Sequence, residues 1–232
     1  MPESFSGCSE WQTVEHALAY LSRADKLPHR TEAERVLLDQ IPLDVKRVLD
    51  LGTGDGRTLA LVKMALPDAE GVALDFSDTM LEQAKRRFCS DKRVKTVKHD
   101  LSLPLASLEL GSFDAVVSSL AIHHLSDERK KQLYREVFLL LNPGGVFCNL
   151  DHVSSPSLNL HLKFLSQIGM LPENEDPSNK LLDVETQLAW LRDIGFVDVD
   201  CCWKWLEIAL LVGSKSAKSR EYPTNHIGKN SH

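Results

Sequence analysis

The sequence lacks several features that mark particular classes of protein. Its 232 residues include five cysteines, none in a C-x-x-C pair, and no secretion signal pattern precedes them. We therefore expect reduced thiols and a cytoplasmic location. Long hydrophobic runs are missing as well: the longest apolar stretches, such as residues 208–212, fall far short of the roughly 20 residues that a membrane-spanning helix needs. The sequence thus predicts a protein without a membrane segment.

Positive charge is also scarce. The chain has 33 acidic residues against 27 lysines and arginines, a formal net charge of −6. It therefore lacks the electrostatic footprint that a phosphate backbone requires, and we do not expect nucleic acid as a partner. Basic clusters at residues 85–87 and 129–131 fall within predicted amphipathic helices. The simplest interpretation of each cluster is a helix face in contact with solvent.

The length and the order of elements indicate one α/β domain. A hydrophobic content of 43% suits a single domain with a substantial core. Helix and strand patterns alternate over residues 11–215, as a mostly parallel sheet requires. Residues 1–10 and 216–232 are polar or without periodicity, and we expect them to be disordered. Two final strands, at 196–201 and 207–213, are joined by so short a link that they must pair antiparallel.

Polar residues mark where the predicted helices begin and end. Thr31 with Glu34 fits a capping box for a helix at about residues 32–41. The residue pair Pro143–Gly144 is expected to end the helix that starts near residue 127. Further N-caps are expected at Ser77, Ser126 and Asp183.

Three alternating glycines are the most informative feature of the chain. The apolar strand at residues 48–51 runs into Gly52, Gly54 and Gly56, where the backbone must turn sharply and let a ligand come close. Dinucleotide-binding folds use the spacing G-x-G-x-x-G, but here the third glycine arrives one residue early. No Lys-Ser or Lys-Thr pair follows, so a P-loop is not indicated either. The pattern favours an adenosine ligand without a pyrophosphate.

This run resembles the first motif of the class I S-adenosylmethionine-dependent methyltransferases. Later stretches resemble family motifs in the same order and spacing: Asp75 after the strand at 71–74, then residues 99–101, 113–118 and 141–147. The resemblance spans roughly residues 30 to 215. It implies a doubly wound α/β fold with a mostly parallel seven-stranded sheet and an antiparallel last strand. It also implies S-adenosylmethionine as the cofactor and transfer of its methyl group to a small-molecule acceptor by in-line displacement.

The resemblance also implies roles for the cofactor site. Asp75 would accept both ribose hydroxyls, although the same acid could cap the helix after it. Asp100 would bind the adenine amino group beside the Leu101 amide, or else form a turn. Asp50 would orient the ammonium group, and Arg30 is the candidate for the methionine carboxylate. The complete expected set is Arg30, Asp50, Gly52, Thr53, Gly54, Asp75, Phe76, Asp100, Leu101 and Ser118.

Adjacent histidines follow the fourth predicted strand, where the resemblance places the transferable methyl group. We expect one of His123 and His124 to act on the acceptor as a base or to orient it, while the other packs structurally. His152, beside Asp151, is a second candidate. Adjacent histidines diverge and no carboxylate-rich spacing completes a metal site, so no metal is expected. The long irregular stretch at 155–182 is expected either to cover the substrate or to be a surface flap.

Other functions remain open at this stage. The chain has no N-P-P-Y-like motif and no Pro-Cys pair, which disfavours acceptors within nucleobases. Residues 184–206 also resemble the carboxy-S-adenosylmethionine synthases, but no basic cluster precedes Asp183 to hold a dicarboxylate. A regulator that binds the cofactor without turnover would carry the same glycine and acid motifs. The acceptor, its attacking atom and the oligomeric state are not set by the sequence.

Overall fold

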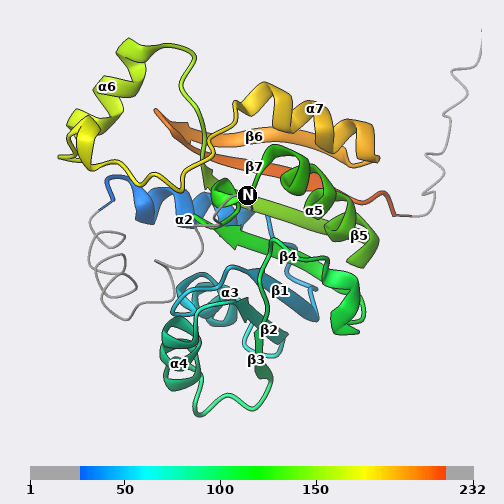
Figure 1. The fold of residues 1–232 in the computed structure, drawn as a ribbon. Coiled ribbons are helices and arrows are strands. Elements are labelled where there is room, and N and C mark those ends of the chain that lie inside the picture. Colours follow the sequence, from blue (N-terminus) through cyan, green and yellow to red (C-terminus); the bar gives the residue numbers. More distant parts are fainter. Residues whose placement is uncertain (1–26, 218–232) are drawn as a thin grey trace, which may run out of the picture.

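The computed structural model of the chain describes residues 27–217, so the expected disorder of residues 1–10 and of nearly all of 216–232 lies outside the described residues. Seven strands form one sheet in the order β3-β2-β1-β4-β5-β7-β6 (Figure 1). The strands are β1 (Arg47–Leu51), β2 (Glu70–Asp75), β3 (Val94–Lys98), β4 (Phe113–Ser119), β5 (Leu141–His152), β6 (Val197–Trp205) and β7 (Ile208–Ser214). Strands β1 to β5 pair in parallel, and β7 pairs antiparallel with both β5 and β6. The predicted fold is confirmed.

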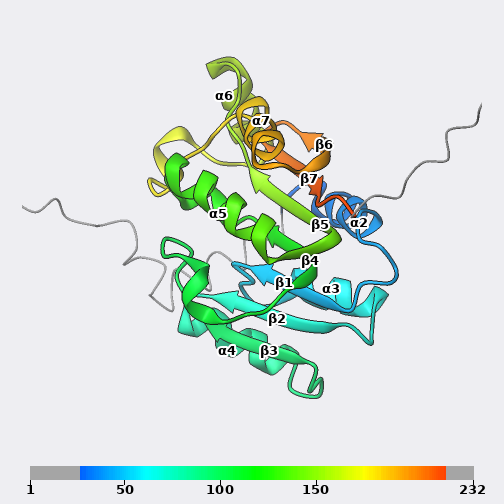
Figure 2. The ribbon, with the colours of Figure 1, turned by 90° about the vertical axis from the view of Figure 1, so that its right-hand side faces the viewer.

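Helices cover both faces of the sheet. They are α2 (Arg30–Asp39), α3 (Arg57–Ala65), α4 (Asp78–Arg87), α5 (Asp127–Leu140), α6 (Leu158–Gln167) and α7 (Val184–Ile194). Short 3-10 turns are η2 (Leu105–Leu108), η3 (Ile122–His124) and η4 (Pro172–Asn174). Helices α5 and α2 lie on opposite sides of the sheet (Figure 2), and α7 packs on α5. Helix α6 stands apart from these layers (Figure 1).

The central strands are largely apolar on both faces because both faces are covered. In β1, Leu49 and Leu51 pack with Phe147 in the layer beneath α5 and α7. Val48, just before Leu49, packs with Leu59 of α3 on the other side. Alternate residues of a strand point to opposite faces, so a strand between two helical layers reads as a continuous apolar run.

Three of the expected helix caps are confirmed. The side chains of Ser77, Ser126 and Asp183 each accept a hydrogen bond from a backbone N–H three residues later, at the starts of α4, α5 and α7. The expected capping box is wrong. Helix α2 begins at Arg30, and its N-cap is His29, which makes no side-chain capping bond. The box fails because the Glu34 carboxylate binds two arginine side chains instead.

Pro143 and Gly144 do not end helix α5. The helix already ends at Leu140, and Leu141 pairs with Phe113 as the first residue of β5. The pairing of β4 and β5 then shifts register, so the proline falls in an irregular part of the ladder. Proline is tolerated at such places because its missing N–H breaks no regular ladder bond.

Helix α6 buries only part of its apolar surface. Phe164 and Leu165 are buried, but Leu158 and Leu162 are 69% and 43% exposed. Phe164 and Leu165 anchor the second half of the helix in the core. Within residues 27–217, no helix combines the length and apolar character needed to cross a bilayer.

Candidate active site

The loop at residues 52–56, here called the glycine loop, folds back against the end of β2. Thr53 N–H donates to the Leu74 carbonyl at 2.9 Å, and Gly54 N–H donates to Asp75 Oδ2 at 2.9 Å. Gly52 and Gly54 have φ angles of +65° and +56°, which side chains with a Cβ rarely adopt. The loop geometry therefore depends on glycine at both positions.

These two glycines face different surroundings. A Cβ on Gly52 would lie 2.3 Å from the Cβ of Ala121, so the loop touches the segment that leads into η3. A Cβ on Gly54 would meet no heavy atom within 4 Å, although Asp75 accepts a bond from the same residue. Gly52 thus allows the loop to pack against the residue that precedes η3 and its histidines. Gly54 leaves space for a ligand beside Asp75.

Two acids border the glycine loop. Asp50 is fully buried; its Oδ2 accepts the Thr53 hydroxyl at 2.6 Å, and its Oδ1 has no partner among the described residues. Burial raises the pKa of Asp50 to about 7. Asp75 is 7% exposed and accepts backbone N–H groups from Gly54 and Ser77, while burial raises its pKa. Both acids have acceptor capacity left for ligand donors.

Those features fit an adenosine ligand that carries an ammonium group. The unpartnered oxygen of Asp50 needs a donor, because buried polar atoms are rarely left unbonded. An ammonium would supply that donor, and the open space at Gly54 would take part of the ligand. Asp75 does not itself cap α4: its Oδ1 accepts the N–H of Ser77, and the Ser77 side chain makes the capping bond.

Arg30 lies in a buried ion-pair network that the sequence did not reveal. Arg30 Nε donates to Glu34 Oε1 at 2.9 Å, and Arg57 reaches the same carboxylate with two nitrogens at 2.6 and 2.9 Å. Burial on its own would raise the pKa of Glu34, but the two arginines outweigh it and hold that pKa below its ordinary value. The network ties α2 to α3 directly behind the glycine loop.

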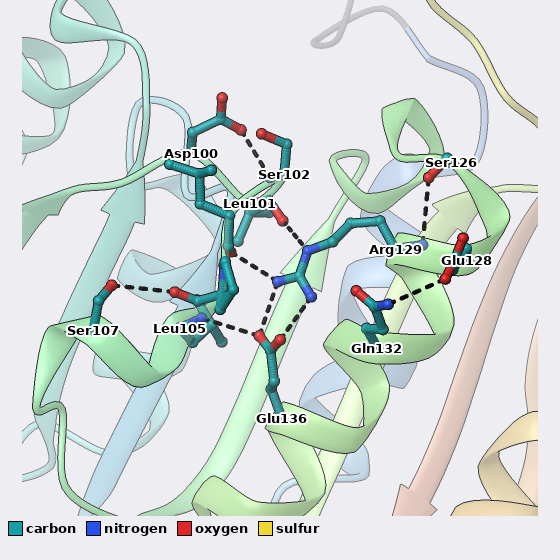
Figure 3. A network of polar contacts seen from close by, with 12 residues as sticks. Asp100, Leu101, Ser102, Leu105, Ser107, Ser126, Glu128, Arg129, Gln132 and Glu136 are labelled. Atoms are coloured by element: carbon teal, nitrogen blue, oxygen red, sulfur yellow. Dashed lines mark hydrogen bonds and ion pairs between the residues drawn. The ribbon is translucent and has the colours of Figure 1, made fainter.

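The basic cluster at 129–131 was expected to face solvent, and for its first two members this is wrong. Arg129 and Lys130 are only 8% and 1% exposed. Arg129 forms a double ion pair with Glu136 and also donates to the carbonyls of Leu101 and Leu103 (Figure 3). A buried guanidinium must satisfy its donors, and the loop after β3 supplies the carbonyls. Arg129 thereby fixes the loop that contains Leu101.

Two expected site residues make structural bonds of their own. Asp100 Oδ1 accepts the Ser102 N–H at 2.8 Å, so the turn-forming role is present (Figure 3). Ser118 is fully buried and its hydroxyl donates to the Leu51 carbonyl at 2.8 Å, which joins β4 to β1. The cofactor roles of both residues stay predictions.

His123 has a buried carboxylate partner. Its Nδ1 lies 2.6 Å from Asp151 Oδ1, with 8% and 2% of the two side chains exposed. The His124 ring lies beside it, with ring centroids 4.0 Å apart, and His124 Nδ1 meets the Ser178 hydroxyl at 2.9 Å. Burial, and then the charge of His123, hold the pKa of His124 well below its ordinary value. The Asp151 carboxylate at its Nδ1 makes His123 the better oriented of the two for general-base catalysis.

A second histidine pair lies next to the first. His152, at the end of β5, has its ring centroid 5.6 Å from that of His123. Its Nε2 meets Glu207 Oε2 at 3.0 Å, and His161 of α6 meets Glu207 Oε1 at 3.0 Å and Glu175 at 3.1 Å. We call the following set the histidine cluster: His123, His124, His152, His161, Asp151, Glu175 and Glu207. Among residues 27–217, no three His, Cys, Asp or Glu side chains are arranged to hold a metal ion.

Comparisons with known proteins agree with this geometry. Residues 49–147 match the family model described as a methyltransferase domain. The demethylmenaquinone methyltransferase of Clavibacter sepedonicus is 33% identical over 175 residues, which cover 68% of this chain and 69% of the relative. The malonyl-[acyl-carrier protein] O-methyltransferase of a Marinomonas species is 37% identical over 127 residues, or 53% of this chain and 45% of the relative.

A solved structure matches the fold. An O-methyltransferase family protein from Burkholderia thailandensis superposes with a TM-score of 0.72 at 19% identity, covering 94% of this chain and 65% of that one. With the five motifs, the strand order and the relative from Clavibacter, the family is established. The chain belongs to the class I S-adenosylmethionine-dependent methyltransferases.

Proposed function

We propose that this chain transfers the methyl group of S-adenosylmethionine to a small-molecule acceptor held at the histidine cluster. One observation carries the proposal: the glycine loop and η3 meet at Gly52 and Ala121. A ligand bounded by Gly54 and Asp75 would therefore lie next to an acceptor beside His123. The meeting point is at the carboxyl ends of β1 and β4, where the strand order reverses and α/β folds bind their ligands.

In the proposed complex, this chain holds the cofactor by its separate polar parts. Asp75 accepts the ribose hydroxyls through lone pairs that its two backbone bonds leave available. Asp50 accepts from the ammonium group through its unpartnered Oδ1. Arg30 is assigned to the carboxylate, and Asp100 with the Leu101 amide to the adenine. The remaining members of the proposed site are Gly52, Thr53, Gly54, Phe76 and Ser118.

The proposed chemistry needs positioning and one base. S-adenosylmethionine supplies a methyl group already activated by a sulfonium, and aligning two bound reactants can lower the barrier by roughly 7–11 kcal/mol. His123 Nδ1–H donates to Asp151, which leaves Nε2 to accept the proton that the acceptor loses as it attacks the methyl carbon. Asp151 fixes this tautomer and stabilises the imidazolium that forms.

Relatives support a methyl acceptor but differ in which one. Of the two described above, one is named for demethylmenaquinone and the other for a malonyl-[acyl-carrier protein]. Both names describe methyl transfer, which favours this activity over carboxy-S-adenosylmethionine synthesis or cofactor-dependent regulation. A histidine that removes a proton suits an acceptor with an ionisable O–H, N–H or acidic C–H. We further propose that residues 155–182, here called the cover, lie over this acceptor.

The test is a product assay with a set of small acceptors. Wild-type protein is incubated with S-adenosylmethionine and phenols, hydroquinones, carboxylic acids or amines, and mass spectrometry follows S-adenosylhomocysteine and any product heavier by one methylene. The His123→Gln variant is the matched control for background. Transfer to at least one acceptor, lost in the variant, supports the proposal. Cofactor binding without methylated product across all classes, and with crude metabolite extracts, would favour a regulator.

A further inference from the structure

His161 is bound in a way that fixes its charge. Its Nδ1 lies 3.0 Å from Glu207 Oε1, and its Nε2 lies 3.1 Å from Glu175 Oε2. An ionised carboxylate can only accept hydrogen bonds, whereas a neutral imidazole can donate from one nitrogen only. Both contacts form together only when both nitrogens carry a proton. The observed geometry therefore requires His161 as a cation.

The two carboxylates belong to different parts of the molecule. Glu207 is fully buried in the turn between β6 and β7, 46 residues after His161 in the sequence. Glu175 follows η4 within the cover itself, and its side chain is 29% exposed. His161 thus ties α6 both to the sheet and to the returning half of the cover.

Further polar contacts hold the end of the cover. Ser178 meets His124 at 2.9 Å, and Lys180 N–H donates to the His123 carbonyl at 3.0 Å while the Lys130 ammonium binds the Lys180 carbonyl. Near its start, by contrast, α6 exposes Leu158 and is buried only in its second half. The His161 ion pairs are the charged contacts that hold the middle of the cover.

Glu207 also connects His161 to the proposed acceptor site. Its other oxygen meets His152 Nε2 at 3.0 Å, and the His152 ring packs edge-on at 5.6 Å from His123 and at 5.1 Å from Phe164 of α6. A change at His161 would therefore alter the closure of the cover and the orientation of His152 together.

From this arrangement we infer that His161 is a positioning residue: as a cation it holds the cover closed over the acceptor and orients His152 through Glu207. The inference rests on the proposed function only for what lies beneath the cover. Losing the proton breaks one of the two ion pairs, so the cover opens and acceptor binding weakens. The cofactor site, on the other side of Gly52, is not affected.

The direction of the pH effect follows from the groups around His161. Glu207 faces it from the sheet side, where the same carboxylate also meets His152 and, from the first residue of the cover, Ser155. Glu175 faces it from the cover, and Lys163 lies on its own helix. Burial alone would lower the pKa of His161, but the hydrogen bond and charge of Glu207, with Glu175, raise it above 6.5. The stabilisation is complete below 6.5 and is lost as the pH rises through the higher, folded-state pKa.

Hydrogen exchange of the ligand-free protein tests this without any assumption about activity. Protection of α6 and η4, corrected for intrinsic rates, is compared at about pH 6 and about pH 9 for the wild type, His161→Gln and Glu175→Gln. Glu173→Gln, on the exposed turn η4 without a contact to His161, is the matched control. We expect wild-type protection to fall by up to about fivefold on raising the pH, because a partly exposed ion pair contributes roughly 0.2–1 kcal/mol. Both test variants should show low protection at either pH, and the control should behave as wild type.

A kinetic readout separates positioning from a general loss of structure. Once an acceptor is known, His161→Gln should raise its KM several-fold, leave kcat nearly unchanged and keep the cofactor affinity. Wild-type protection and pH dependence in both test variants would overturn the inference, and so would an equal loss of cofactor affinity. If no acceptor is ever methylated, the proposed function fails while the exchange result still decides on the role of His161.

Discussion

The two sides of the proposed site are held together by different interactions. On the cofactor side, the glycine loop is fixed by backbone N–H groups that bind a backbone carbonyl and the carboxylate of Asp75. On the acceptor side, the histidine cluster is assembled by pairs of side chains from β5, η3, the cover and the β6–β7 turn. Backbone contacts are set by the fold, whereas histidine–carboxylate contacts depend on protonation.

This difference predicts opposite responses to pH. Asp50 has a pKa raised to about 7 by burial, and an ammonium ligand favours its ionised form. His161 has a pKa raised by its two carboxylates and holds the cover only as a cation. Cofactor binding should therefore improve as the pH rises through neutrality, whereas acceptor binding should weaken as the pH rises through the raised pKa of His161.

The largest effect is expected from removing the proposed base. A positioned base contributes about 10²- to 10⁴-fold, so His123→Ala should lower turnover by that order while cofactor affinity is nearly unchanged. His124→Ala should mainly lower the melting temperature, because it removes a packed ring and the partner of Ser178. Turnover and melting curves of both variants check this. Wild-type turnover in both would remove histidine from the mechanism.

Gly52 and Gly54 differ in what a new side chain would contact, so alanine substitutions at these two positions should destabilise the protein by different amounts. In Gly52→Ala, the new Cβ would meet Ala121 at 2.3 Å in a left-handed backbone, and we expect a loss of about 2–5 kcal/mol in the free energy of unfolding. Gly54→Ala has the same backbone strain but open space, so about 1–2 kcal/mol should be lost. Denaturant unfolding measures both. Equal destabilisation would show that the contact with Ala121 does not hold the two sides together.

Asp50 provides a smaller effect, visible in cofactor affinity. Binding of S-adenosylmethionine should strengthen by up to about tenfold per pH unit below pH 7 and level off above it, because the carboxyl group must lose its proton first. Calorimetry in buffers of different ionisation enthalpy should detect the released proton. Asp50→Asn should bind more weakly and without this pH dependence. If the affinity of the variant depends on pH as steeply as that of the wild type, a group other than Asp50 releases the proton.

The cofactor side could be predicted from the sequence because its determinants are local. Glycine spacing after an apolar strand and an acid at the end of the next strand are readable without long-range contacts, as with Gly52, Gly54 and Asp75. The mostly parallel sheet followed from the family motifs, and the antiparallel hairpin followed from the short connection between its two strands as well. Helix ends were less predictable, since Glu34 is drawn away from its expected capping role by Arg57, 23 residues later.

The acceptor side was only partly predictable. His123, His124, Asp151 and His152 were recognised as candidates from their places after strands, but not which carboxylate each histidine meets. The sequence pattern places Glu207 at the start of a strand. It does not indicate that Glu207 is fully buried or that its carboxylate contacts His152, 55 residues earlier.

Helix-face patterns carry a similar ambiguity. They could not show that Arg129 turns inward to Glu136 and to the carbonyls of the loop after β3. Such pairings depend on which segments the fold brings together, and a single sequence does not encode that locally.

The most direct test of the central claim is a calorimetric titration of the purified protein with S-adenosylmethionine and, separately, with NAD. The glycine spacing and the acids at positions 50 and 75 predict micromolar binding of S-adenosylmethionine and none of NAD. Asp75→Ala should weaken the binding of S-adenosylmethionine by about 1.5–3 kcal/mol, the range for hydrogen bonds to a charged group, and should also lower the melting temperature, because the Gly54 and Ser77 N–H groups lose their acceptor. Micromolar binding of NAD without binding of S-adenosylmethionine would contradict the account.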